Sequence, residues 1–219
     1  MPCLAWAVLG GEKNILVDSG PCSAEDAKKY FYRPLKKDPD QEIEFALENI
    51  GLKPEDIDIV IFTHLHWDHC FNLEKLTKAR FIVQRIELNY AVNLLPPDRV
   101  AYQVGFGDIL PSWMTVFNRI RTVKGKVEVA PGVHVVSLPG HTPGSQGVVV
   151  DTANGPWIIV GDTVPLYENW DPHDVNKRIA GGIYQNLFDY FDTLDKLSVY
   201  GNRLLPGHEA KVLDKKVYP

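Results

Sequence analysis

The spacing of hydrophobic residues in the first third of the chain predicts a hairpin, a helix and a buried strand. Short apolar runs at 4–9 and 14–17 are separated by glycines and predict the β-hairpin. Apolar residues recur at helical spacing over 40–49, and Gly51 follows where a helix commonly ends. Segment 57–62 alternates at first and then becomes continuously apolar, as a buried strand does.

The rest of the chain adds further strands and two helices. The same patterns predict strands at 79–83, 127–129, 133–138, 147–150, 157–160 and 203–205. They predict helices at 87–95 and 184–199. In the second helix one buried face is expected to consist of Leu187, Phe188, Phe191, Leu194 and Leu197. This order fits an α/β fold in which two sheets pack together with helices outside, in a single domain over 1–219.

Segment 97–118 differs from the rest because its aromatic and apolar residues follow no clean period. It is longer than an ordinary connection, which is typical of binding loops and lids. Aromatic residues that only cap the core, or that form a contact between two copies of the chain, would give the same pattern. The sequence leaves these roles open: a lid, a core cap or a homodimer contact.

Composition and charge narrow the class of protein. The chain has 219 residues, 45% hydrophobic and 23% charged, which suits one ordinary globular domain. Its net charge of -5 offers no basic surface to a nucleic acid, and no apolar run approaches the roughly 18 residues of a membrane span. Cys3, Cys22 and Cys70 cannot all pair and lack zinc-knuckle spacing. We therefore expect free thiols in a reducing compartment, the cytoplasm, and neither a nucleic acid nor a membrane as partner.

One short motif carries the strongest chemical signal. Residues 64–69 read His-Leu-His-Trp-Asp-His, with three of the seven histidines and a carboxylate in six positions. A chance match to this pattern has a probability on the order of one in a thousand. The motif directly follows a predicted buried strand, where a loop can aim several side chains at one point. Imidazoles and carboxylates suit divalent zinc, iron, manganese or cobalt, so the motif predicts a metal centre.

Three further turns supply candidate metal ligands. His141, Asp162 and His208 each follow a predicted strand. Each alone could be structural, since loop histidines often form hydrogen bonds and aspartates often cap turns. The cluster at 64–69 favours the ligand interpretation, because two ions need more donors than one motif supplies.

The other candidates near this chemistry are given structural roles or left open. His134 alternates with apolar residues in a strand, so we expect it at the surface or hydrogen-bonded in the core. Cys70 is expected to be a small buried thiol. The polar stretch around His173 leaves the role of that histidine undecided.

Over nearly its whole length the chain resembles the metallo-β-lactamase superfamily. The family signature, H-x-H-x-D-H followed by a distant His, an Asp and a last His, is matched in order. The resemblance implies an αββα sandwich, with the site at one edge between the sheets and Asp18 supporting it. It implies a first metal ion on His64, His66 and His141, a second on Asp68, His69 and His208, and a bridge through Asp162.

Within that family the closest likeness is to the N-acyl homoserine lactonase group. The likeness extends over the segments 64–69, 79–85, 138–144, 161–169 and 205–208. In those lactonases a tyrosine after the bridging aspartate orients the substrate carbonyl. Tyr167, five positions past Asp162, is the candidate here, while Pro165 occupies the three-residue offset of some members.

The chemistry of such a centre predicts hydrolysis. Two divalent ions about 3.5 to 4 Å apart can share a water whose pKa falls to around 7, which gives a metal-bridging hydroxide. Asp68 or Asp162 can then pass a proton onward. We predict a dinuclear metal-dependent hydrolase of a lactone or related ester, with zinc preferred over iron, manganese or cobalt. Trp67 and segment 97–118 would offer apolar surface to the rest of this small-molecule substrate.

The resemblance to the family leaves other activities open. True β-lactamases of this family usually have cysteine or serine where Asp162 stands, which argues against that activity. Glyoxalase II thioesterases carry a C-terminal helical extension, whereas this chain ends soon after His208. A glyoxalase II-like thioesterase and a di-iron redox or oxygen-binding protein are therefore kept as alternatives.

Overall fold

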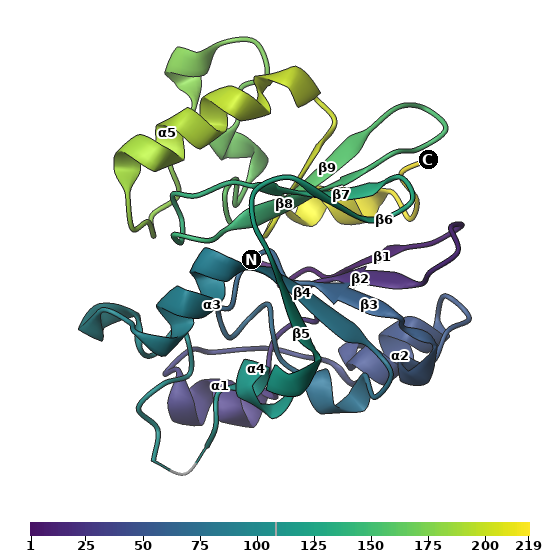
Figure 1. Ribbon diagram of the computed structural model, residues 1–219, viewed down its shortest axis with the longest axis vertical. Helices are drawn as coiled ribbons and strands as arrows, with labels where there is room; N and C mark the ends of the chain where they lie inside the picture. Colours follow the sequence, from purple (N-terminus) through teal and green to yellow (C-terminus); the bar gives the residue numbers. More distant parts are fainter. Residues whose placement is uncertain (108) are drawn as a thin grey trace.

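The chain folds as two facing β-sheets with helices on both outer sides (Figure 1). This computed structural model describes residues 1–107 and 109–219. The first sheet has the order β1-β2-β3-β4-β5, and the second has the order β10-β9-β8-β7-β6. The predicted αββα sandwich is confirmed.

In the first sheet the opening hairpin leads into parallel strands. Its strands are β1 (Trp6–Val8), β2 (Ile15–Val17), β3 (Ile59–Ile61), β4 (Arg80–Gln84) and β5 (Ile120–Val123). β1 pairs antiparallel with β2, and the remaining neighbours pair in parallel. Because both faces of this sheet are covered, its strands are almost continuously apolar.

The second sheet is mainly antiparallel. Its strands are β6 (Val127–Ala130), β7 (Val133–Ser137), β8 (Gln146–Val150), β9 (Trp157–Gly161) and β10 (Leu204–Pro206). Only the β9–β10 pair within this sheet is parallel. The carboxyl ends of β9 and β10 therefore point the same way, which brings the residues after them together.

Helices cover the outer face of each sheet. They are α1 (Ala24–Tyr30), α2 (Ile43–Glu48), α3 (Arg85–Val92), α4 (Ser112–Thr115) and α5 (Leu187–Lys196). Short 3-10 helices occupy Pro39–Gln41, Pro54–Asp56, Leu73–Lys75, Pro96–Asp98, Phe117–Arg119, Tyr167–Asn169, Val175–Lys177, Leu197–Tyr200 and Ala210–Asp214. In Figure 1, α1, α2 and α4 lie below the first sheet and α5 lies above the second. Within the described residues, every helix is too short or too polar to cross a bilayer.

Three apolar layers follow from the alternation of side chains along the strands. Val17 and Ile61 face the second sheet and pack with Val148 and Ile159. Residues of opposite orientation in the first sheet pack on α2 through Leu47. The outer face of the second sheet is covered by α5. The two sheets are thus fixed against each other on the side from which the candidate ligands emerge.

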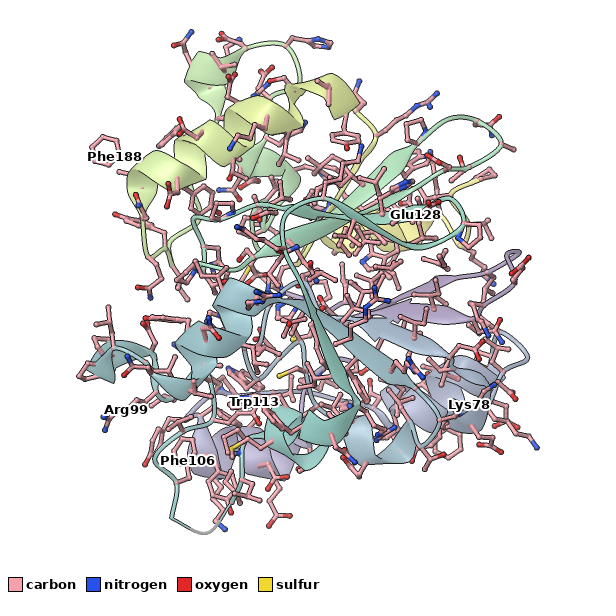
Figure 2. All side chains as sticks on the ribbon, in the orientation of Figure 1. Lys78, Arg99, Phe106, Trp113, Glu128 and Phe188 are labelled. Carbon is pink, nitrogen blue, oxygen red and sulfur yellow. The ribbon has the colours of Figure 1, made fainter. Side chains whose placement is uncertain are left out.

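The buried face of α5 differs from the prediction. Leu194 and Leu197 are buried as predicted. Leu187 and Phe191 are exposed, and Phe188 is 87% exposed and points away from the sheet (Figure 2). The helix instead buries Tyr190 and Thr193 beside Leu194. Tyr190 donates a hydrogen bond to the carbonyl oxygen of Asp162, and Thr193 donates one to that of Pro139. These hydrogen bonds satisfy the two hydroxyl groups, so both side chains can be buried. A prediction from hydrophobic spacing alone places such polar side chains at the surface.

Segment 97–118 contributes to the core below the first sheet. Tyr102 and Trp113 are fully buried there, whereas Leu110 and Phe117 are exposed. Position 108 lies outside the described residues. Burial of the two aromatic rings fits the core cap that the sequence left open. A lid or dimer role for this segment stays a prediction.

Candidate metal centre

All the predicted ligands lie in loops at one edge of the sandwich. The motif 64–69 follows β3, and His141 lies in the loop between β7 and β8. Asp162 follows β9 and His208 follows β10. Gly207 lets the last two loops meet, since a Cβ at that position would lie 2.6 Å from Asp162 Oδ1. The fold therefore brings ligands from distant parts of the chain to one place.

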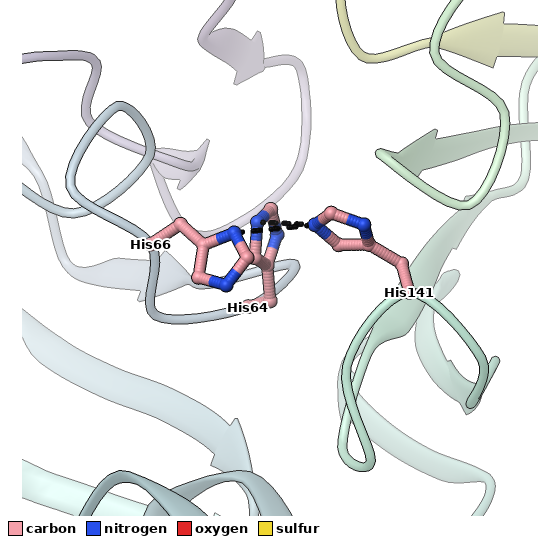
Figure 3. A group of neighbouring side chains, drawn as sticks. All are labelled: His64, His66 and His141. Atoms are coloured by element: carbon pink, nitrogen blue, oxygen red, sulfur yellow. Dashed lines mark hydrogen bonds between the residues drawn. The ribbon is translucent and has the colours of Figure 1, made fainter. Parts of the chain in front are cut away.

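The first group consists of three buried histidines (Figure 3). His141 Nε2 lies 3.2 Å from His64 Nε2 and 3.2 Å from His66 Nδ1. One nitrogen atom of each ring points to a common centre, and the rings come from two facing loops. Nitrogen lone pairs held this close repel each other unless a proton or a cation lies between them. The group therefore suits one divalent ion with imidazole ligands.

The second group combines histidines with carboxylates. Asp162 Oδ1 lies 3.2 Å from His69 Nε2 and 3.0 Å from His208 Nε2. Asp68 contributes a carboxylate 3.9 Å from His69 Nε2 and 3.7 Å from His208 Nε2. His69 Nε2 and Asp162 Oδ1 are buried without a hydrogen-bond partner among the described residues. Buried polar atoms of this kind are rare, and a cation between them would satisfy both.

Asp162 lies between the two groups. Its Oδ2 atom is 3.5 Å from His141 Nε2, while Oδ1 faces His69 and His208. A carboxylate can use one oxygen for each of two ions. This position suits the bridging role that the sequence resemblance implies.

Each of four histidines has its second ring nitrogen held by a neighbour. His64 Nδ1 lies 3.1 Å from Thr63 Oγ1, and His69 Nδ1 lies 2.8 Å from Asp18 Oδ2. The two remaining Nδ1 atoms face backbone carbonyl oxygens: His141 at 2.9 Å from Ile183 and His208 at 2.7 Å from Pro2. A ring that donates through Nδ1 keeps the Nε2 lone pair for a metal ion. The rings are therefore oriented as ligands.

Asp18 has the supporting position that the resemblance implies. Its carboxylate accepts hydrogen bonds from the Thr63 backbone N–H at 2.7 Å and from the Thr63 hydroxyl at 2.8 Å, besides contacting His69. Its backbone is left-handed, with φ 60°. Aspartate tolerates this conformation better than most residues. Asp18 thus joins the end of β2 to the start of the motif loop.

Glu87 is a supporting residue that sequence reasoning missed. This fully buried carboxylate on α3 accepts hydrogen bonds from Leu65 N–H and Gly144 N–H and from the hydroxyls of Tyr102 and Thr142. It therefore connects the motif loop to the loop of His141. A signal was present in the sequence: Glu87 shares a helix face with Ala91, four residues later, and that face is buried.

The remaining candidates lie apart from these groups or have structural partners. Cys70 is a fully buried thiol that accepts a hydrogen bond from Gln103 Nε2, as expected. His134 on β7 is partly exposed, 3.9 Å from Glu128. His173 is exposed, and its N–H bonds to Asp171. The Tyr167 hydroxyl donates to the Leu204 carbonyl oxygen at 3.4 Å.

Electrostatics divides the metal-free site into a neutral half and a charged half. Burial and neighbouring imidazoles hold the pKa values of His64 and His66 well below the usual range. Burial also opposes a charge on His69 and His208, but nearby carboxylates, Asp162 first, outweigh it and raise both pKa values. Burial works against the Asp162 carboxylate too, yet His69 and His208 hold its pKa well below the usual range. Without metal, the carboxylates therefore favour the protonated forms of His69 and His208.

Removing metal is expected to make stability depend on pH. Raised pKa values of His69 and His208 mean that the stability they contribute is full below about pH 6.5 and is lost as pH rises through the folded-state values. Asp162, with a lowered pKa, contributes at neutral and alkaline pH alike. A bound cation replaces the protons. The gap in Tm between metal-loaded and chelator-treated protein should therefore widen from about pH 6 to about pH 9. A gap that stays constant or narrows would contradict this coupling.

Comparisons with known proteins agree with the donor set. The model of the Metallo-beta-lactamase superfamily matches residues 1–208. An N-acyl homoserine lactonase of Bacillus sp is 29% identical over 180 residues, covering 78% of this chain and 67% of that protein. A probable metallo-hydrolase of Methanocaldococcus jannaschii is 27% identical over 181 residues, covering 83% of this chain and 71% of that protein.

Solved structures share the fold. An N-acyl homoserine lactone hydrolase with N-hexanoyl-L-homoserine at its catalytic metal center superposes with a TM-score of 0.75 at 23% identity, covering 100% of this chain and 86% of that one. The dizinc lactonase AidC gives 0.68 at 17% identity, covering 93% and 71%. Since the family model matches almost the entire chain and the family's donors meet at one edge, the protein belongs to the metallo-beta-lactamase superfamily and is a metal-dependent hydrolase.

Proposed function

We propose that the protein opens a lactone or a related ester at a centre of two divalent ions, with zinc as the preferred metal. The observation that carries this proposal is the convergence of imidazole and carboxylate donors around Asp162, which faces both groups. His64, His66 and His141 would hold one ion, and Asp68, His69 and His208 the other, with Asp162 shared. Bound there, the ions would polarise the substrate carbonyl and activate a water for attack between them.

The chain's own carboxylates would manage the protons of the reaction. Water adds to the carbonyl carbon, the ring C–O bond breaks, and the leaving oxygen needs a proton. Asp68 is the more exposed carboxylate, with a side chain 19% accessible against 12% for Asp162. Asp68 can therefore exchange protons with solvent, while Asp162, flanked by His69 and His208, keeps its charge.

An aromatic cluster beside the motif supports a substrate with an apolar part. Trp67 stands between two predicted ligands and stacks on Phe31 with ring centroids 4.7 Å apart. Phe71 and Phe106 pack on the same ring of Phe31. An acyl chain could extend over this surface while its lactone ring lies at the ions. The lactonases that this chain resembles act on N-acyl homoserine lactones, as their names state.

Tyr167 keeps its proposed place as the residue that orients the substrate carbonyl. Burial raises the pKa of Tyr167 to about 12, so the hydroxyl stays protonated at neutral pH and can donate a hydrogen bond. That hydroxyl now donates to Leu204. To donate to a substrate carbonyl, the hydroxyl would have to give up this hydrogen bond.

A chelation and reloading experiment tests the proposed function. We expect hydrolysis of acyl homoserine lactones to disappear after chelation and to return with zinc, at about two ions per chain. S-lactoylglutathione is assayed in parallel as the thioester substrate of the first alternative. A visible absorption band that changes on reduction would indicate the second alternative, a di-iron redox protein. A zinc-loaded protein that turns over neither lactone nor ester would overturn the proposal.

The three cysteines bear on the compartment in which the protein works. Cys3, Cys22 and Cys70 are free thiols. Such thiols persist where the surroundings are reducing. We therefore keep the cytoplasm as the proposed compartment.

A further inference from the structure

Cys3 lies beside the second group of donors. One ligand atom each from Cys3, Asp68 and His208 lies within 4.8 Å of the other two. Donors on a single zinc ion are about 3 to 4 Å apart, so a small adjustment would place all three on one ion. The sequence motifs give no hint of this arrangement, since Cys3 precedes β1 and is 65 residues from Asp68.

The segment that carries Cys3 is fixed to the site by its own backbone. The carbonyl oxygen of Pro2 accepts a hydrogen bond from His208 Nδ1 at 2.7 Å. His208 Nε2 on the other side of the ring faces Asp162 and Asp68. The next residue, Cys3, thereby lies close to Asp68 and His208. Figure 1 shows the N-terminus between the two layers of the sandwich.

A second observation indicates that this place binds a cation. His69 is almost fully buried, yet its Nε2 atom has no hydrogen-bond partner among the described residues and faces Asp68 and Asp162. Thiol, imidazole and carboxylate atoms thus share one small volume.

We infer that Cys3 Sγ is an additional ligand of the second metal ion, beside Asp68, His69, His208 and the shared Asp162; this inference rests on the proposed function. On binding, the thiol releases its proton to solvent and the sulfur donates an electron pair to the ion. A thiolate favours zinc or cobalt over manganese, which prefers oxygen ligands. Cys3 would therefore set the metal preference of the second position, while the three-histidine group stays independent of it.

Cobalt substitution of the full chain tests this assignment through absorption. In the protein loaded with Co²⁺, we expect a near-ultraviolet thiolate-to-cobalt charge-transfer band, besides the visible bands of cobalt itself. Cys3→Ser should abolish the charge-transfer band and keep the visible bands of the first ion. Cys22→Ser is the matched control and should retain every band, because Cys22 lies in none of the groups of candidate metal donors among the described residues. Zinc affinity of the second position should fall about tenfold or more in Cys3→Ser.

The outcomes separate this inference from the proposed function. Two bound cobalt ions with no charge-transfer band in the unaltered protein would overturn the role of Cys3 and leave the metal centre standing. A band that survives in Cys3→Ser would also overturn it, by assigning the sulfur to another cysteine. Failure to bind cobalt or zinc at all would overturn both. The visible cobalt bands, which come from His64, His66 and His141 as well, report whether Cys3→Ser is folded.

Discussion

Replacing Asp162 by asparagine is expected to lower kcat/KM for lactone hydrolysis by about 10³-fold. The carboxylate faces His69 and His208 with one oxygen and His141 with the other. An asparagine of the same shape keeps one acceptor and turns an N–H₂ group toward either set of donors. It also removes a negative charge that would offset the two proposed ions. Both effects weaken metal binding and the positioning of the reacting water.

The test combines kinetics with metal analysis. Steady-state rates and metal content per chain are measured for Asp162→Asn under zinc-replete conditions. Asp192→Asn, an exposed position on α5, is the matched control and should behave as the unaltered protein. If Asp162→Asn retained more than about a tenth of the activity, the bridging role would be wrong.

Most strands could be predicted from the sequence because their apolar patterns are local, but β5 (Ile120–Val123) was not predicted. Residues 59–62 form an unbroken apolar run, which indicates a strand buried on both faces, and the hairpin before them has two apolar runs around glycines. Helix α1 (Ala24–Tyr30) was missed since it buries only Ala27 and depends on its cap, where Ser23 accepts from Asp26 N–H. Such a short polar helix leaves no hydrophobic period to detect.

The metal centre could be predicted only in part, and the reason is also physical. The motif at 64–69 is compact in sequence, and the strand ends indicated where His141, Asp162 and His208 would lie. The groups that orient the rings are different. The carbonyl oxygens of Pro2 and Ile183 hold two histidines, and a backbone carbonyl is the same for every residue type. No sequence pattern marks such contacts, and the proximity of Cys3 depends on one of them.

Glu87 connects the two loops that carry the three-histidine group, His64, His66 and His141. Its Oε1 accepts from Leu65 N–H at 3.0 Å and from the Tyr102 hydroxyl at 2.7 Å. Its Oε2 accepts from Gly144 N–H at 3.1 Å and from the Thr142 hydroxyl at 2.7 Å. Burial raises the pKa of Glu87, and these hydrogen bonds oppose the rise. The contact with Gly144 is so close that a Cβ there would lie 2.3 Å from the backbone nitrogen of Glu87.

Glu87→Gln is therefore expected to reduce the free energy of unfolding by about 2 to 5 kcal/mol, despite the nearly identical shape of the side chains. A glutamine supplies one acceptor oxygen, so its N–H₂ group must face either the pair at Leu65 and Tyr102 or the pair at Gly144 and Thr142. The backbone N–H of the facing pair would then be buried without an acceptor. Denaturant unfolding of the metal-free chain measures this loss without interference from metal binding.

Glu48→Gln, an exposed position on α2, makes the same chemical change away from the loops and should change the free energy of unfolding by less than about 0.5 kcal/mol. The structure predicts more than a loss of stability for Glu87→Gln, because the freed loops carry His64, His66 and His141. Zinc affinity of the three-histidine group should fall together with stability, while the control keeps both. If Glu87→Gln were as stable as the control, the donors at Leu65 and Gly144 would have other acceptors, and Glu87 would not hold the ligand loops together.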